Sequence, residues 1–201
     1  MTFASGWASG INAYATVFVL GMLGRFAGTG GVPEGFQRTD VLWVMGILAL
    51  VELVADKIPL LDSLWDVPAT VIRPVAGAVI GALIAGANGD LLTIALAAVG
   101  GVTALLSHVA KAGIRLAVNT SPEPVSNVAA SVAGDVGVVG VSVMAVMYPV
   151  AAAVVAAVLL LGMLALAWRL GSRVLRGWRW LRSRWLGSRP RAGAGAEADL
   201  G

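Results

Sequence analysis

A long apolar run with one charge near its middle constrains the fold of this chain more than any other feature. In residues 128–147 the only ionisable side chain is Asp135, and a helix of that length crosses a bilayer. An acidic residue at the centre of such a helix costs roughly 3 kcal/mol, so it usually faces a bundle interior, a partner or water. One helical face collects the polar positions Asn127, Ser131, Asp135 and Ser142. The run therefore predicts a membrane helix with one polar side toward an internal site, although polar contacts that only hold helices together would follow the same spacing.

The composition extends this interpretation to the whole chain. Of 201 residues, 58% are hydrophobic and only 12% are charged, whereas soluble domains have roughly 25% charged residues. The absence of cysteine excludes disulfides, thiolate metal sites and cysteine nucleophiles. The single histidine, His108, excludes a three-histidine zinc site within one subunit. The expected fold class is an all-α polytopic membrane helix bundle.

Six apolar segments of suitable length follow one another along the chain. We expect spans at residues 5–27, 41–58, 68–87, 91–118, 126–147 and 150–170, all within one transmembrane domain of residues 1–170. Prolines predict broken helices at Lys57-Ile-Pro59 and Ser121-Pro-Glu-Pro124. The short connection Tyr148-Pro149 is compatible with either a turn or a kink.

The excess positive charge lies after the last span. Eight arginines follow residue 168 and are interleaved with Trp178, Trp180 and Trp185. By the positive-inside rule this block places the C-terminus in the cytoplasm, and six spans place the N-terminus there too. We expect residues 171–186 to form a basic interfacial helix on anionic lipid and residues 187–201 to be disordered. The charge therefore indicates a membrane surface as partner, with no nucleic acid.

A weak internal similarity suggests two repeats. Arg25-Phe-Ala27 matches Arg115-Leu-Ala117 at a spacing of 90 residues, and Pro59 matches Pro149 at the same spacing. The halves 1–90 and 91–170 would each hold three spans and would be inverted relative to each other, as in many secondary transporters. The alternative is chance similarity between helices rich in Gly, Ala and Val.

Four carboxylates within fifteen residues form the richest candidate site. Glu52 and Asp56 lie four residues apart, and Asp62 and Asp66 repeat that spacing after a proline. Such groups could carry protons or bind a divalent cation such as magnesium, for which Asp62 and Asp66 are the candidate ligands. The alternative is an ion-pair network with the nearby cations Lys57, Arg73, Lys111 and Arg115.

Polar positions on other spans add candidate binding residues. Asn12 belongs to a polar face of the first span, and Asn127 begins the polar face of the fifth. His108, Lys111 and Arg115 share one face of the fourth span. These residues could bind a solute or only join helices, and a lone histidine more often packs as a satisfied bundle residue.

Several short motifs occur together in this chain. They are Glu-x-x-x-Asp-Lys-Ile-Pro-x-x-Asp-x-x-Trp-Asp at residues 52–66, Arg73-Pro74, His108-x-x-Lys-x-x-x-Arg115 and Asn119-Thr-Ser-Pro-Glu-Pro-x-Ser-Asn127. With Ser9-Gly10 and Asp135, they resemble the bacterial integral membrane family catalogued as domain of unknown function 4126, over about residues 5–150. The resemblance implies a small polytopic protein of the bacterial inner membrane, and it implies no particular activity.

Three functions are compatible with these features. We favour a transporter or channel for a small ion or polar solute, because broken helices and intramembrane carboxylates are typical of transport sites. Its binding residues would be Glu52, Asp56, Asp135, Asn12, His108, Lys111, Arg115 and Asn127. The alternatives are a magnesium-dependent enzyme or carrier of a lipid phosphate at the cytoplasmic face, and a non-catalytic scaffold that uses the Arg/Trp tail. A homo-oligomer is compatible with each function.

Overall fold

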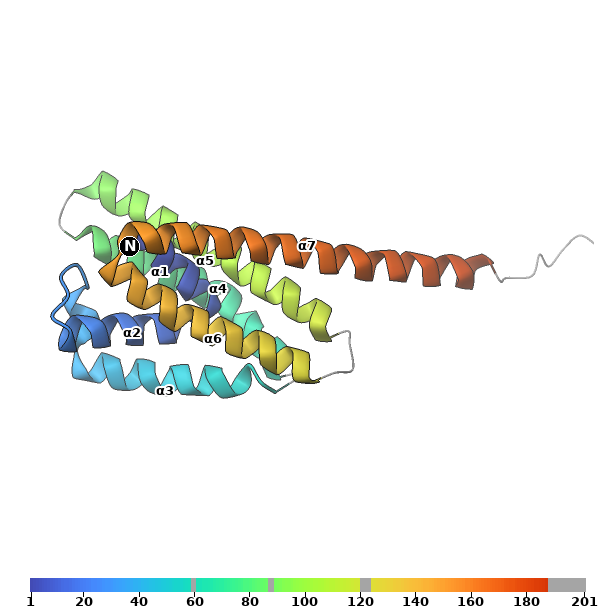
Figure 1. Ribbon diagram of the computed structural model, residues 1–201, viewed down its shortest axis with the longest axis horizontal. Coiled ribbons are helices and arrows are strands. Elements are labelled where there is room, and N and C mark those ends of the chain that lie inside the picture. Colours follow the sequence, from blue (N-terminus) through green and yellow to red (C-terminus); the bar gives the residue numbers. More distant parts are fainter. Residues whose placement is uncertain (59–60, 87–88, 120–123, 188–201) are drawn as a thin grey trace, which may run out of the picture.

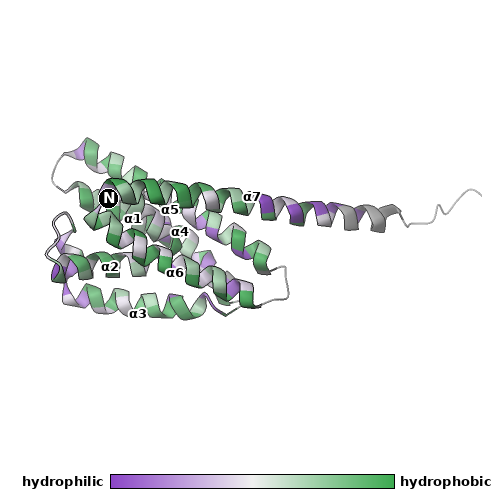
Figure 2. Ribbon diagram, viewed as in Figure 1, coloured by the Kyte–Doolittle hydropathy of each residue, from purple (hydrophilic) through white to green (hydrophobic). Residues whose placement is uncertain are grey.

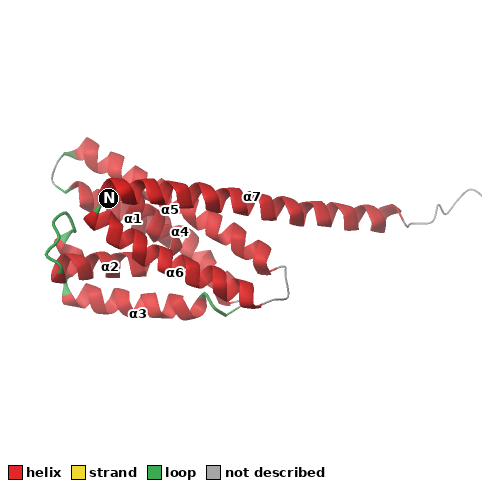
Figure 3. Cartoon of the chain, viewed as in Figure 1, coloured by secondary structure: helices red, strands yellow, loops and turns green. Residues whose placement is uncertain are grey.

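The computed structural model describes residues 1–58, 61–86, 89–119 and 124–187, which form seven α-helices and one short 3-10 helix (Figure 1). The α-helices are α1 (Thr2–Ile11), α2 (Ala13–Phe26), α3 (Thr39–Ala55), α4 (Leu61–Ala85), α5 (Asp90–Asn119), α6 (Pro124–Met147) and α7 (Pro149–Gly187), and the 3-10 helix η1 is Glu34–Gln37. Every regular element in these ranges is helical (Figure 3), which confirms the all-α prediction.

The helices carry apolar side chains outward and charged side chains inward. Val75, Val136 and Leu161 are 55%, 67% and 68% exposed, whereas Glu52 and Arg73 are each 1% exposed. A surface that faces lipid tails requires this distribution, and Figure 2 shows hydrophobic residues along most of the bundle. Four described segments are long and apolar enough to cross a membrane: Leu64–Ala85, Asp90–Val118, Val125–Met147 and Pro149–Arg179. The chain is therefore a helical membrane protein, as predicted.

The first predicted span, residues 5–27, is two short helices rather than one. Asn12 is extended between α1 and α2 (φ −152°, ψ 100°), and its side-chain oxygen accepts a hydrogen bond from the amide of Ala15 at 2.8 Å. This cap satisfies an amide at the start of α2 that a continuous helix would have bonded internally. Met1 packs against the apolar cluster that contains Leu20 and Val32, so the chain doubles back after α1 (Figure 1).

The start of α1 and the end of α7 consequently lie at opposite ends of the bundle (Figure 1). The start of α1 and the α2–α3 connection share one end, which we call the N-terminal end (Figure 1). The α3–α4 connection and the arginine-rich part of α7 lie at the other end, which we call the basic end. The sequence placed both termini on the cytoplasmic side because it counted residues 5–27 as one full crossing, and that placement stays a prediction.

Other predicted boundaries also shift. Residues 60–67, expected as a connector, largely belong to α4, which includes Pro68 and Pro74 within the helix. Tyr148 alone separates α6 from α7, and the chain direction reverses there, so this connection is a turn (Figure 1). Helix α7 is continuous through residues 171–186, and the contact of this part with a membrane surface stays a prediction. Most of the predicted breaks at Pro59 and at 121–124, and the tail from residue 188, lie outside the described residues.

The two predicted repeats differ at their first element. In the first half α1 and α2 double back, whereas α5 in the second half is one helix of 30 residues. The inverted repeat therefore stays a prediction.

Close packing of α1, α4 and α5 brings their polar side chains together. A Cβ atom on Gly10 would lie 2.2 Å from the carbonyl oxygen of Ala104, and one on Gly77 would lie 2.6 Å from that of Gly100. Small residues let membrane helices approach to backbone contact in this way. The end of α1 is therefore held directly beside the charged faces of α4 and α5.

Candidate functional site

Charged side chains from α3, α4 and α5 meet in the interior of the bundle. We call this group the charge cluster, and it consists of Glu52, Asp56, Asp62, Asp66, Arg73, Lys111 and Arg115. Its four carboxylates and three cations give a formal charge of −1 when all are ionised. The sequence left an ion-pair network open as an alternative to a metal site, and the structure shows such a network.

Arg73 lies at the centre of the charge cluster. Its guanidinium forms a fully buried ion pair with Glu52 and lies 3.5 Å from Asp66 Oδ1. The same group donates to Nδ1 of His108 at 2.7 Å. Removing two charges from water costs several kcal/mol for each ion, so such a pair is tolerated only where further hydrogen bonds satisfy it. Arg73 has these additional partners.

The contacts of His108 define its protonation. A guanidinium only donates, so Nδ1 must accept from Arg73, and the ring proton must lie on Nε2. Nε2 then donates to Thr70 Oγ1 at 3.1 Å, and the Thr70 hydroxyl donates to the carbonyl oxygen of Asp66 at 2.8 Å. His108 is therefore a neutral histidine that orients Arg73.

The second half of the charge cluster is built on Asp56. Lys111 Nζ and Arg115 Nη2 lie 2.5 and 3.0 Å from Asp56 Oδ2. Arg115 also lies 2.9 Å from Asp66 and 3.5 Å from Asp62. Within the described ranges, no three His, Cys, Asp or Glu side chains form a group that could hold a metal. The magnesium site predicted at Asp62 and Asp66 gains no support, because both carboxylates face Arg115.

Cations of the charge cluster also bind the end of α1. Lys111 Nζ donates to the carbonyl oxygen of Ile11 at 2.8 Å, and Arg73 Nη1 donates to that of Gly10 at 3.4 Å. The last carbonyls of a helix lack internal partners and carry partial negative charge, so cations stabilise them. The end of α1 and the charge cluster therefore form one polar site inside the membrane.

Asp135, predicted as a binding residue together with Glu52 and Asp56, forms an ion pair of its own. Its carboxylate lies 3.3 Å from Lys57 Nζ, which also donates to the carbonyl oxygen of Leu53 at 2.9 Å. The side chains of Asp135 and Lys57 are 18% and 31% exposed, more than most of the charge cluster. Asp135 also lines a cavity.

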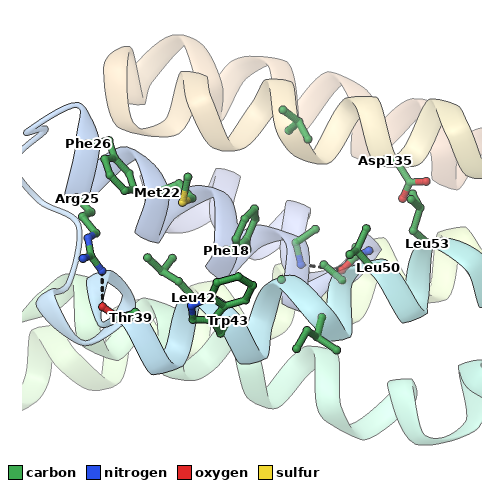
Figure 4. Close-up of a pocket in the computed structure, with 16 residues that line it drawn as sticks. Phe18, Met22, Arg25, Phe26, Thr39, Leu42, Trp43, Leu50, Leu53 and Asp135 are labelled. Atoms are coloured by element: carbon green, nitrogen blue, oxygen red, sulfur yellow. Dashed lines mark hydrogen bonds between the residues drawn. The ribbon is translucent and has the colours of Figure 1, made fainter.

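The α2–α3 cavity, of about 590 Å³, lies between α2 and α3 and reaches α6. Figure 4 shows Arg25 and Thr39 at one end of it and Asp135 at the other. Arg25 is close to the end of α2, so that part of the cavity is at the N-terminal end of the bundle. Asn12, at the α1–α2 break, also lines the cavity. The walls between these polar ends are mainly apolar.

The α5–α7 cavity, of about 270 Å³, lies between α1, α5, α6 and α7. Lys111 and Arg115, from the last turns of α5, line it together with Asn127, from the first turn of α6. These helix ends belong to the basic end of the bundle (Figure 1). The two cavities therefore extend toward opposite ends.

The match with known sequences covers the whole bundle. The family described as a domain of unknown function (DUF4126) matches residues 1–169. The chain belongs to the DUF4126 family. No curated protein and no solved structure matches it. The family has no described activity, so the function of this DUF4126 member must be inferred from its geometry.

The predicted site residues of this DUF4126 bundle fall into three groups. The charge cluster and its histidine hold Glu52, Asp56, His108, Lys111 and Arg115, the α2–α3 cavity is lined by Asn12 and Asp135, and the α5–α7 cavity by Asn127. Thr70 and the central position of Arg73 were not predicted from the sequence. Asp66, Thr70 and Arg73 are spaced by four and three residues, which is a helical face that could have revealed them.

Proposed function

We propose that this protein transports a small ion or polar solute across the membrane, past the α1–α2 break. The observation that supports this best is how closely the two cavities approach each other. Ile11 and Gly134 line the α5–α7 cavity. The residues that directly follow them in the chain, Asn12 and Asp135, line the α2–α3 cavity. A thin layer of two short segments therefore separates cavities that extend toward opposite ends.

A barrier of this kind suits alternating access. Transport sites commonly lie near the bilayer midplane at discontinuous helices, whose freed backbone groups and helix ends contact the solute. Here α1 ends and α2 begins at Asn12, beside the charge cluster. Helices α1 and α6 are in close contact in this layer, since a Cβ atom on Gly134 would lie 3.3 Å from Ile11 Cγ2. A small movement of α1 against α6 would open one cavity toward the other.

The charge cluster provides groups that can respond to a solute. Glu52 Oε2 and Asp56 Oδ1 are buried, and neither has a hydrogen-bond partner among the described residues. Each can accept a proton or a donor of the solute. The Asp135–Lys57 pair, at the edge of the α2–α3 cavity, would have to rearrange as a solute passes.

Cysteine accessibility tests the two cavities. The chain has no cysteine, so single cysteines can be introduced into a clean background. Ala49 lines the α2–α3 cavity and Ala130 lines the α5–α7 cavity. A membrane-impermeant thiol reagent should label Ala49→Cys from the N-terminal side of the membrane and Ala130→Cys from the basic side. Labelling of both positions from the same side would contradict the proposal.

Flux in proteoliposomes tests transport itself. Dye-based assays of ion and proton movement, and swelling assays for polar solutes, should show protein-dependent flux. Asp135→Asn should reduce this flux to background, because it removes the charge at the barrier. Asp40→Asn is the matched control, since Asp40 is paired only with exposed Arg38 far from the barrier. Equal flux in the two variants would contradict a role for Asp135.

A further inference from the structure

Among the described residues that line the α5–α7 cavity, the charged ones are both positive. They are Lys111 and Arg115, and none of the described lining residues is Asp or Glu. The described walls therefore favour an anion over a cation. The carboxylates paired with Lys111 and Arg115 belong to Asp56, Asp62 and Asp66, none of which lines the cavity.

Three further lining residues carry buried polar atoms without partners. Trp7 Nε1, Asn127 Nδ2 and Ser131 Oγ have no hydrogen-bond partner in the part of the chain that the structure describes. These residues are 2%, 3% and 5% exposed. An indole N–H and an amide NH₂ can only donate, and a hydroxyl can do so. Burying unpaired donors is unfavourable, so their gathering at one cavity indicates a ligand with acceptor atoms.

The two cations keep donors beyond those their ion pairs use. Lys111 has three N–H donors, and two serve the carbonyl oxygen of Ile11 and the carboxylate of Asp56. Arg115 has five N–H donors, and its three ion pairs engage fewer than all of them. A carboxylate in the cavity can therefore receive charge-assisted hydrogen bonds, which are the strongest kind.

The remaining wall of the cavity is apolar. Helix α7 contributes Leu159, Met163 and Leu166, and α5 contributes Ile114. The volume of about 270 Å³ lies below the roughly 300–1,000 Å³ of pockets for drug-sized ligands. The cavity therefore suits a small molecule with a charged acceptor group and a short apolar tail.

We propose that the α5–α7 cavity binds a small carboxylate with a short aliphatic chain. Lys111 and Arg115 supply the positive charge, and Trp7, Asn127 and Ser131 supply neutral donors. We further assign small aliphatic carboxylates as the solute class of the protein, and this assignment rests on the proposed transport function. The binding site itself does not depend on transport.

Calorimetric titration of the purified full-length protein with butyrate tests the site. Butyramide has nearly the same shape without the charge, butylammonium has the opposite charge, and chloride lacks the tail. Butyrate should bind at least about tenfold more tightly than each of them, since hydrogen bonds to charged groups are the stronger ones. Butyramide, butylammonium or chloride binding as tightly as butyrate would overturn the proposal.

Variants assign the binding to this cavity. Trp7→Phe removes one N–H and keeps an aromatic ring, and Ser131→Ala removes one hydroxyl. Each should weaken butyrate binding about tenfold, as expected for a lost hydrogen bond to an ion. Ser142→Ala is the matched control, because Ser142 is another buried, unpartnered hydroxyl of α6 that does not line the cavity. If Trp7→Phe fails to fold, Ser131→Ala decides, and unchanged binding in it would overturn the proposal.

Binding and flux measured on the same variants separate this proposal from the transport function. Asp135→Asn should abolish flux, whereas Ser131→Ala should weaken butyrate binding. Flux that depends on Asp135 without any butyrate binding would overturn the carboxylate site and leave transport standing. Butyrate binding without flux of any solute would support the site and overturn transport.

Discussion

Arg73 is the residue on which the interior of this protein depends. Its guanidinium contacts a buried carboxylate of α3, the histidine of α5 and a terminal carbonyl of α1. These contacts join three helices through one side chain of α4. Loss of Arg73 would leave the Glu52 carboxylate buried with no guanidinium, which is far more unfavourable than losing an exposed pair.

We expect Arg73→Met to destabilise the protein by roughly 3–5 kcal/mol, the usual effect of breaking a buried ion pair. Thermal unfolding in detergent measures the change. Arg38→Met is the matched control, because Arg38 and Asp40 form an ion pair with exposed side chains and such pairs contribute little.

The double variant Glu52→Gln with Arg73→Met tests the cause of that loss. It removes the stranded charge, so it should be more stable than Arg73→Met alone. A double variant that is less stable than Arg73→Met would show that the arginine acts through contacts other than Glu52.

At the scale of elements, α1 is the unusual one, because ten residues form a helix that enters the bundle and stops at Asn12. Packing holds it in place: Ala4, Trp7, Ala8 and Ile11 are all at most 2% exposed. Its backbone lies directly against α5, where Ser107 Oγ donates to the carbonyl oxygen of Trp7 at 2.9 Å. The position of α1 therefore depends on small residues at the α1–α5 contact.

We expect Gly10→Ala to destabilise the bundle by about 1–3 kcal/mol or more, as overpacking does. Its Cβ would lie 1.9 Å from Ser107 Oγ and 2.2 Å from the backbone oxygen of Ala104, and a backbone atom cannot rotate away. Gly140→Ala is the control, since a Cβ there meets nothing within 4 Å. That change should be neutral or stabilising by up to about 1 kcal/mol, because alanine favours helix. Thermal unfolding of both variants measures the difference. Equal stability of Gly10→Ala and Gly140→Ala would contradict the close packing of α1 against α5.

At the scale of the whole molecule, the doubled-back α1–α2 unit sets the relation between the termini. With α1 and α2 not crossing, α3 to α7 alternate between the two ends, and the N-terminus and the end of α7 are separated (Figure 1). From the positive-inside rule we expect the basic end, with Lys57, Lys111 and the α7 arginines, to face the cytoplasm.

Reporter tags test this arrangement. A tag at the N-terminus and one at Gly89, in the α4–α5 turn, should report the same side of the membrane, and a tag at the C-terminus should report the other. Protease protection in sealed vesicles provides the measurement. A signal from the N-terminus on the same side as the C-terminus would contradict the doubled-back unit and restore six crossings.

The arginine-rich extension of α7 belongs to the same scale, because it projects beyond the bundle (Figure 1). Arg173, Arg176 and Arg179 are exposed on it. Changing these three to Gln should weaken binding of the detergent-solubilised protein to vesicles rich in anionic lipid, since each basic residue near such a surface contributes about 1 kcal/mol. Flux should persist, because both cavities lie elsewhere. Loss of flux with unchanged vesicle binding would show that the extension serves the transport path instead.

The sequence alone determined the fold class, and it offered an ion-pair network around residues 52–66 as one of several alternatives. Helices of membrane length, the arginine block and the acidic residues 52–66 are local in the chain, so composition and spacing reveal them. The family resemblance rested on the same local motifs and is confirmed. A helix also presents residues four apart on one face, which is why Lys111 and Arg115 were expected together and both contact Asp56.

Only the tertiary structure decided which charges pair and where the cavities lie. The ion pair of Asp135 with Lys57, 78 residues away in sequence, could not be predicted from spacing. The break at Asn12 was also not predicted. A single asparagine in an apolar run is compatible with a continuous helix, and only the packing of its neighbours against α4 and α5 ends α1 there. Pairing and breaking of helices depend on contacts between distant segments, and spacing along one helix carries no information about them.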